Sequence, residues 1–159
     1  MGYAVLARVS HMVTRIDIDT YFLQMANLVR TRGTCARRRV GCVLTNSHRH
    51  VLATGYNGVA AGLPHCIDTP CPGAECPSGT GLDLCEAIHA EQNALLQCRD
   101  VWAIDTCYCT ASPCVTCVKL LMNTSCRRIV FSEEYPHTAA RVFWLSIEGR
   151  EWIRLSTAV

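Results

Sequence analysis

Two short segments of this 159-residue chain constrain its fold most. Residues 89–91 read His-Ala-Glu, and residues 113–117 read Pro-Cys-Val-Thr-Cys. Together they offer one imidazole and two thiolates, enough to hold a zinc ion with a fourth position left open. That layout is typical of a catalytic zinc site, because a structural site fills all four positions with protein atoms. The fold must therefore bring the two segments together.

Each residue of this motif suits a chemical role. Cys114 and Cys117 lie at the start of a predicted helix, where the positive dipole end favours thiolate and the spacing lets both sulfurs reach one ion. His89 supplies a neutral nitrogen. Zinc held this way lowers the pKa of its bound water, and Glu91 is free for general acid–base work. The alternative is a structural zinc knuckle with a bystander glutamate.

Composition indicates one folded domain. Half of the residues are hydrophobic, 18% are charged and the net charge is +2, too weak to favour a nucleic-acid partner. No apolar run approaches the length of about 20 residues that spans a membrane. Residues 1–12 lack a clear signal-peptide cleavage site, so we expect a cytoplasmic protein. The basic run at 37–39 is either a solvated turn or an anion site.

Twelve cysteines need an explanation in a chain of this length. Without an export signal and with a His-x-Glu motif, metal binding explains them better than disulfides. Four of them lie in apolar or strand-like surroundings, where cysteine packs as a small hydrophobe, and we expect these in the core: Cys42, Cys107, Cys109 and Cys126.

Apolar periodicity predicts alternating helices and strands. We expect helices at 16–32, 84–98, 114–123 and 137–148, and strands at 40–45, 51–56, 105–111, 127–131 and 151–155. Asp19 or Thr20 is the expected cap of the first helix, and Ser112 that of the third. The order predicts a three-layer α/β/α sandwich on a mixed central sheet of about five strands, with a hairpin first and parallel pairing later.

The predicted organisation is an N-terminal extension at 1–15 followed by a single domain at 16–159. A stretch rich in glycine, proline and cysteine, residues 58–82, interrupts the regular elements. A loop of this length in a compact domain is usually functional or pinned.

Residues 21–131 resemble the deoxycytidylate deaminases of phage and bacterial type, within the cytidine and deoxycytidylate deaminase superfamily. The resemblance rests on Cys-Ala-Arg-Arg-Arg-Val-Gly-Cys at 35–42, Gly-Tyr-Asn-Gly at 55–58, His-Cys at 65–66 and His-Ala-Glu-Gln-Asn-Ala at 89–94. The zinc signature alone is shared by all zinc deaminases of nucleobases. The additional segments argue against the tRNA adenosine and riboflavin-pathway deaminases.

This resemblance implies a cytidine deaminase-like fold and a hydrolase acting on the C–N bond of a cyclic amidine. The implied reaction converts dCMP to dUMP and ammonia and so supplies a thymidylate precursor. Glu91 would be the catalytic residue, and His89, Cys114 and Cys117 would hold the catalytic zinc.

The resemblance also implies substrate contacts. Asn57 would meet the deoxyribose and Arg37 the 5′-phosphate, where a guanidinium can grip two oxygens. Tyr135 would lie near the phosphate, and His65 and Ala90 would line the pocket. Asn57 as a turn residue and Tyr135 as a rim aromatic are the alternatives.

A second, structural zinc is a further implication. Cys35, Cys66, Cys71 and Cys85 would hold it and pin the long loop, and Cys76 could replace one of them. The alternative is a set of free thiols. Family members are often hexamers, activated by dCTP with Mg²⁺ and inhibited by dTTP. The other readings kept open are a deaminase of another cytosine nucleotide, a deaminase of nucleic-acid bases, and a non-catalytic zinc-binding module.

Overall fold

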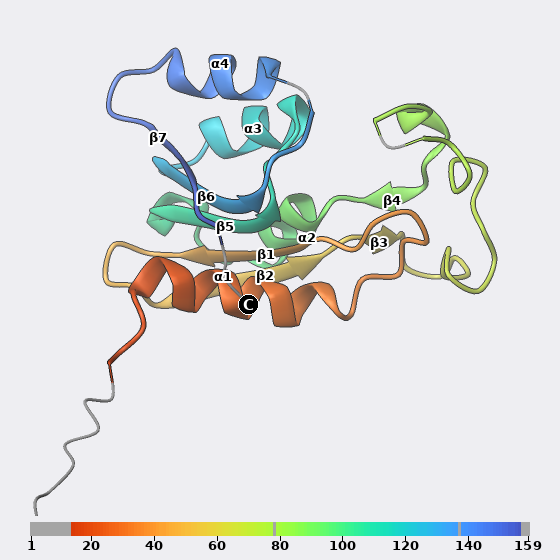
Figure 1. Cartoon of the computed structure of the whole chain (residues 1–159), viewed down its shortest axis with the longest axis horizontal. Coiled ribbons are helices and arrows are strands. Elements are labelled where there is room, and N and C mark those ends of the chain that lie inside the picture. Colours follow the sequence, from red (N-terminus) through yellow and green to blue (C-terminus); the bar gives the residue numbers. More distant parts are fainter. Residues whose placement is uncertain (1–13, 78, 137, 157–159) are drawn as a thin grey trace, which may run out of the picture.

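The computed structural model describes residues 14–77, 79–136 and 138–156, and its centre is a twisted sheet (Figure 1). Five strands lie in the order β2-β1-β5-β6-β7. Their bounds are β1 Gly41–Thr45, β2 Val51–Tyr56, β5 Thr106–Ala111, β6 Arg128–Glu133 and β7 Glu151–Arg154. Strand β1 is antiparallel to β2 and β5, whereas β5, β6 and β7 are parallel. The predicted hairpin and mixed sheet are confirmed.

Helices cover both faces of the sheet, as predicted. Their bounds are α1 Ile18–Arg30, α2 Ala90–Gln97, α3 Val115–Met122 and α4 Ala139–Leu145. Helix α1 packs Phe22, Leu23 and Ala26 onto one face, and α2, α3 and α4 share a larger core with the other (Figure 1). Alternate strand residues divide between the two cores, so β5 is buried along its whole length. The architecture is a three-layer α/β/α sandwich.

The helix starts differ from the predicted ones. Asp17, not Asp19 or Thr20, caps α1, because its carboxylate accepts hydrogen bonds from the backbone N–H groups of both residues. Asp19 instead forms an ion pair of 2.8 Å with Arg128 of β6. The cap of α3 is Cys114 and not Ser112, whose hydroxyl accepts a hydrogen bond from the Tyr135 N–H.

The helix predicted at 84–98 is too long at its start. Residues Leu82–Leu84 form a 3₁₀ turn (η1), and Ala87–Ile88 form a short strand, β4. Strand β4 pairs antiparallel with β3, Gly58–Val59, and this small sheet holds both ends of the long loop together (Figure 1). Another 3₁₀ turn, η2 at Val101–Ala103, precedes β5. Helix α2 therefore begins only after His89.

No helix within the described residues is long and apolar enough to span a membrane. Most of the predicted extension, residues 1–13, lies outside the described residues. The single domain expected at 16–159 stays a prediction.

Candidate active site

Three candidate zinc ligands lie together where two helices begin. His89 is the N-cap residue of α2, Cys114 is the N-cap residue of α3, and Cys117 lies in the first turn of α3. The His89 Nδ1 atom is 3.5 Å from Cys114 Sγ and 3.4 Å from Cys117 Sγ, and all three ligand atoms lie within 4.8 Å of one another. Short strands lead to both helices, β4 to His89 and β5 to Cys114.

The dimensions of this ligand set fit zinc. A tetrahedral zinc with ordinary bond lengths separates a sulfur ligand from a nitrogen ligand by about 3.6 Å. The observed separations of 3.5 and 3.4 Å match this value closely. Among the described residues this group has three members, two thiolates and one imidazole, which leaves the fourth tetrahedral position open, as a catalytic site requires.

The two thiols of the set do not ionise independently. A hydrogen bond from Cys117 lowers the pKa of Cys114 to about 3. Burial acts in the opposite direction, and a hydrogen bond with His89 adds to the lowering. The hydrogen bond between the two cysteines raises the pKa of Cys117, and the hydrogen bond with Cys114 raises the pKa of His89. One thiolate is therefore favoured without metal, and a divalent cation would supply the charge that the second ionisation needs.

Glu91 lies in the first turn of α2, beside the ligand set, and is only 4% exposed. Burial, reinforced by the nearby Cys107, raises the pKa of Glu91 to about 7, although the charge of His89 acts in the opposite direction. A carboxyl group with a pKa near neutrality can both accept and return a proton at neutral pH. The position and environment of Glu91 suit the general acid–base role expected for it.

The site opens into a cavity of about 540 Å³. The predicted active-site residues that line it include His89, Ala90, Glu91, Cys114 and Tyr135. Arg37 and Asn57, the predicted phosphate and sugar contacts, also line the cavity. The cavity is large enough for one small organic ligand. His65 does not line it: its side chain is 56% exposed and lies 3.8 Å from Asp68, so the predicted substrate contact of His65 stays a prediction.

Asn57 organises the wall of the cavity. Its side-chain oxygen accepts a hydrogen bond of 2.7 Å from the Val40 N–H, and its side-chain nitrogen donates one of 2.7 Å to the Arg38 carbonyl oxygen. These bonds hold the arginine run beside the end of β2. An amide group can make four hydrogen bonds, so two remain for a ligand.

The two arginines of the cavity have different partners. Arg37 donates to the carbonyl oxygens of Gly73 and Pro77, at 3.2 and 2.7 Å, and so ties the long loop to the wall. Arg38 forms a 2.6 Å ion pair with Glu133, and its guanidinium carbon lies 5.8 Å from the centre of the Tyr135 ring. Sequence reasoning identified the arginine run as a candidate anion site but did not single out Arg38.

Of the four cysteines proposed for a second metal, Cys66 and Cys71 lie within the long loop, Cys85 follows it, and Cys35 precedes β1. Cys35, Cys66 and Cys71 are buried, and Cys85 is half-buried. Cys66 Sγ lies 3.5 Å from Cys71 Sγ, and a hydrogen bond from the Glu86 backbone lowers the pKa of Cys71. Among the described residues, these cysteines do not form a group whose ligand atoms all lie within 4.8 Å.

Comparison with known proteins agrees with this geometry. The family model "Cytidine and deoxycytidylate deaminase zinc-binding region" matches residues 16–133. The chain belongs to this family.

Two curated relatives and one solved structure illustrate the match. The deoxycytidylate deaminase of Schizosaccharomyces pombe is 37% identical over 85% of this chain, but the chain spans only 44% of that protein. The deoxycytidylate deaminase of Mycobacterium phage D29 is 38% identical over 77% of this chain, and 99% of that protein is covered. The dCMP deaminase of cyanophage S-TIM5, solved in complex with dCMP and dUMP, is similar in fold, with a TM-score of 0.68 at 24% identity over 88% of this chain and 98% of that one.

Proposed function

We propose that this protein catalyses the zinc-dependent hydrolysis of dCMP to dUMP and ammonia. The observation that carries the proposal is the grouping of His89, Cys114 and Cys117 at a cavity that His89, Cys114 and the buried Glu91 line. A non-catalytic zinc module has no need of a buried carboxylate at this place. The choice of dCMP is supported by the names of the relatives and by the nucleotides in the complex of the cyanophage enzyme.

The reaction replaces the exocyclic amine of the base with oxygen. Zinc bound by the three ligands would supply the Lewis acidity that makes a water molecule nucleophilic near neutral pH. Glu91 takes up one proton from that water and delivers it to the ring nitrogen, then takes up the second proton, from the hydroxyl group now on the ring, and delivers it to the departing amine. One C–N bond breaks, one C–O bond forms, and ammonia leaves. The low exposure of Glu91 keeps this proton from bulk water.

One part of the cavity lining suits a phosphate. Arg37, Arg38 and Tyr135 line it, and Arg38 supplies a guanidinium that shares its charge with the half-exposed Glu133. In our proposal a 5′-phosphate takes the place of Glu133 beside Arg38, while Arg37 adds positive charge from the loop side. Asn57 and Ala90 also line the cavity and would face the sugar and the base.

The direct test is ammonia release from dCMP, deoxycytidine, dCTP and single-stranded DNA by the zinc-loaded protein. We expect the highest kcat/KM with dCMP. Preference for dCTP or for DNA would support the alternative cytosine-nucleotide or nucleic-acid deaminase. No turnover of any of the four would contradict the proposal.

We also propose a second, structural zinc held by Cys35, Cys66, Cys71 and Cys85. The 3.5 Å approach of Cys66 to Cys71 and the burial of three of the four thiols support it. Metal analysis should find two zinc ions per chain, falling to one in Cys66→Ser but not in the matched variant Cys98→Ser. If Cys76→Ser also loses the second zinc, then Cys76 replaces one of the four ligands. One zinc per chain in the unaltered protein would contradict the second site.

Regulation, assembly and location complete the proposal. The family resemblance supports activation by dCTP with Mg²⁺, inhibition by dTTP and a hexamer. Exposed apolar side chains on and near α4, among them Val142 and Phe143, offer an interface. The twelve free cysteines suit the reducing cytoplasm. Rates measured with each effector and sedimentation analysis test these points, and flat rates with both effectors would contradict the regulation.

A further inference from the structure

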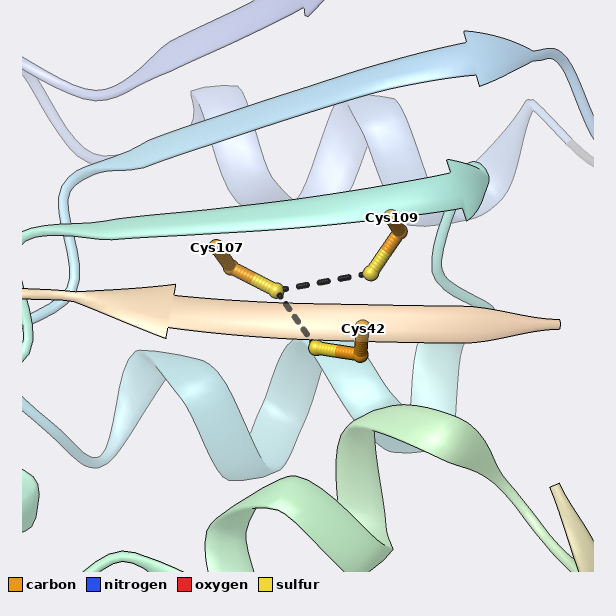
Figure 2. Close-up of side chains that lie close together, drawn as sticks. All are labelled: Cys42, Cys107 and Cys109. Carbon is orange, nitrogen blue, oxygen red and sulfur yellow. Dashed lines mark hydrogen bonds between the residues drawn. The ribbon is translucent and has the colours of Figure 1, made fainter. Parts of the chain in front are cut away.

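A second cluster of thiols lies on one face of the sheet, where β1 and β5 pair. Cys42 is opposite Cys109 in the antiparallel register, and Cys107 precedes Cys109 by two residues, so all three side chains leave the same face. Cys107 Sγ lies 3.6 Å from Cys42 Sγ and 3.5 Å from Cys109 Sγ, and all three sulfurs lie within 4.8 Å of one another. Figure 2 shows the side chains turned toward one another, with hydrogen bonds from the Cys107 sulfur to both others.

The surroundings of this trithiol cluster are apolar. All three cysteines are 0% exposed and belong to the core shared with α2 and α3, which includes Ala90, Ala94, Val118 and Leu121. Within the described residues, the side-chain hydrogen bonds of these thiols join them only to one another. Those bonds lower the pKa of Cys107, while burial raises the pKa of Cys42 and Cys109. No basic side chain is among the main causes of these shifts.

Charge balance determines what such a site can hold. Three thiolates carry three negative charges, so a monovalent or divalent ion would leave a net negative charge in the core. An uncompensated buried charge costs several kcal/mol, on the order of the stability of a domain. A trivalent centre leaves the complex neutral. Thiolate is a soft ligand and favours soft partners. The site thus calls for a trivalent, thiol-seeking atom that accepts three ligands.

We propose that Cys42, Cys107 and Cys109 form a binding site for a trivalent metalloid, of which arsenite is the representative. In the binding step each S–H group exchanges with one As–OH group of arsenous acid. Three As–S bonds form, three As–O bonds break and three water molecules leave, with no change in the oxidation state of arsenic or sulfur. The proposal does not depend on the substrate of the active site.

Binding at the trithiol cluster also has a consequence for α2. Ala90 and Ala94 of that helix pack in the same core as the three thiols, and Glu91 lies between these alanines in the sequence. An atom added beneath the helix must move it, because protein interiors are close-packed. Arsenite therefore slows any reaction that Glu91 catalyses, without displacing zinc from His89, Cys114 and Cys117.

The competing explanation is that the three cysteines only pack, as small hydrophobes. To separate the two, the zinc-loaded protein is incubated with arsenite under a phosphine reductant, freed of unbound arsenic, and analysed for both elements. The full chain should retain about one more arsenic atom than Cys107→Ser, since removing one of three ligands abolishes the site. The matched control is Cys126→Ala, which alters another buried cysteine of the same core and should bind like the unaltered chain. Equal arsenic in Cys107→Ser and the unaltered chain would overturn the proposal.

Two further measurements cover a variant that does not fold. Cys109→Ser should lose the same arsenic atom. In the unaltered chain, native-state hydrogen exchange of β1 and β5 should slow when arsenite is bound, because a ligand of the folded state suppresses opening. Unchanged exchange would count against the site. Cadmium provides the test of charge: retention of Cd²⁺ but not arsenite by the three thiols would overturn the trivalent assignment.

Discussion

Strand β5 leads to two thiol clusters with the same donor atoms and opposite surroundings. Just beyond the end of the strand, Cys114 and Cys117 meet the imidazole of His89 at the N-termini of two helices, and Cys114 and His89 line a cavity. In the middle of the strand, Cys107 and Cys109 meet Cys42 in a core without exposed surface. The first set therefore has two helix dipoles, both nitrogen and sulfur ligands, and access from the cavity.

The difference shows that position along a strand determines what a cysteine can do. Residues in the middle of a central strand are covered on both faces, so their thiols meet only apolar groups and one another. Residues just beyond the strand end meet unpaired backbone N–H groups and open space. Catalytic chemistry needs the second setting, whereas the first favours a bound atom that leaves the complex with its thiolates neutral.

The largest predicted effect is a difference in zinc binding between variants of the two clusters. Cys114→Ala should weaken zinc binding more than about 100-fold, because even the loss of an outer partner of a ligand costs 10- to 100-fold. Activity should disappear with the zinc. Cys109→Ala should keep this zinc, as measured by metal analysis after dialysis against a chelator. If both variants lost the metal equally, the distinction between the two clusters would fail.

The next prediction concerns the buried carboxyl group of Glu91, whose pKa is affected by Cys107 of one cluster and by His89 and Cys114 of the other. Glu91→Gln should lower kcat for dCMP by about 10²- to 10⁴-fold, since it removes the general acid–base while preserving shape. Zinc content should stay unchanged. Glu148→Gln, an exposed glutamate, is the matched control. Normal turnover by Glu91→Gln would favour a non-catalytic zinc module.

A smaller effect is expected from a change at Arg38 in the cavity lining. Arg38→Gln should lower kcat/KM for dCMP by about 10- to 100-fold through KM, the range of one hydrogen bond to a charged group. The low turnover of deoxycytidine should not change, because that substrate lacks the phosphate. Arg32→Gln, an exposed arginine near the end of α1, serves as control. Equal losses with both substrates would show that Arg38 has only a structural role.

The smallest effect lies at the start of β5. Burial would raise the pKa of Asp105, but hydrogen bonds from Thr106 and Arg127, the latter at 2.7 Å, lower it overall. A lowered pKa in the folded state stabilises the protein above the unfolded value near 3.9, and this stability is lost as the pH falls through the folded value. Asp105→Asn should therefore cost about 1 kcal/mol at pH 7.

Urea unfolding at several pH values tests this prediction. The difference between Asp105→Asn and the unaltered chain should shrink as the pH falls below 4 or so. A difference that stays constant with pH would show that the ion pair does not contribute. Zinc content should be the same in both proteins, because Asp105 lies at the opposite end of β5 from Cys114.

Much of the fold followed from the sequence because long periodic segments encode it. The helices near Phe22 and Val118 and the apolar strands were predicted to within a few residues. The pairing of β3 with β4 was missed, because strands of two residues have no periodicity. The cap at Asp17 was missed because neighbouring polar residues compete for that position and only the backbone geometry decides between them.

The candidate site followed a similar division. Residues with unusual chemistry, such as His89, Glu91 and Cys114, were identified from a known sequence signature, and the structure brings them to one cavity. Arg38 was not distinguished from Arg37, because the directions of adjacent loop side chains depend on backbone angles. The cysteines expected in the core are buried, but the contact between Cys42 and Cys107 depends on a strand register that no local pattern encodes.

The hydrogen bonds from Arg37 to the long loop have a consequence for how this protein could diversify. Ala74, Cys76 and Leu82 of that loop form part of the cavity wall, whereas the reacting groups stand on the helices and the sheet. The loop is held at its ends by the pairing of β3 with β4 and at its middle by the hydrogen bonds of the Arg37 guanidinium, so its remaining residues can change independently of the helices and the sheet. Insertions or deletions there would reshape the cavity and leave His89, Glu91 and Cys114 in place.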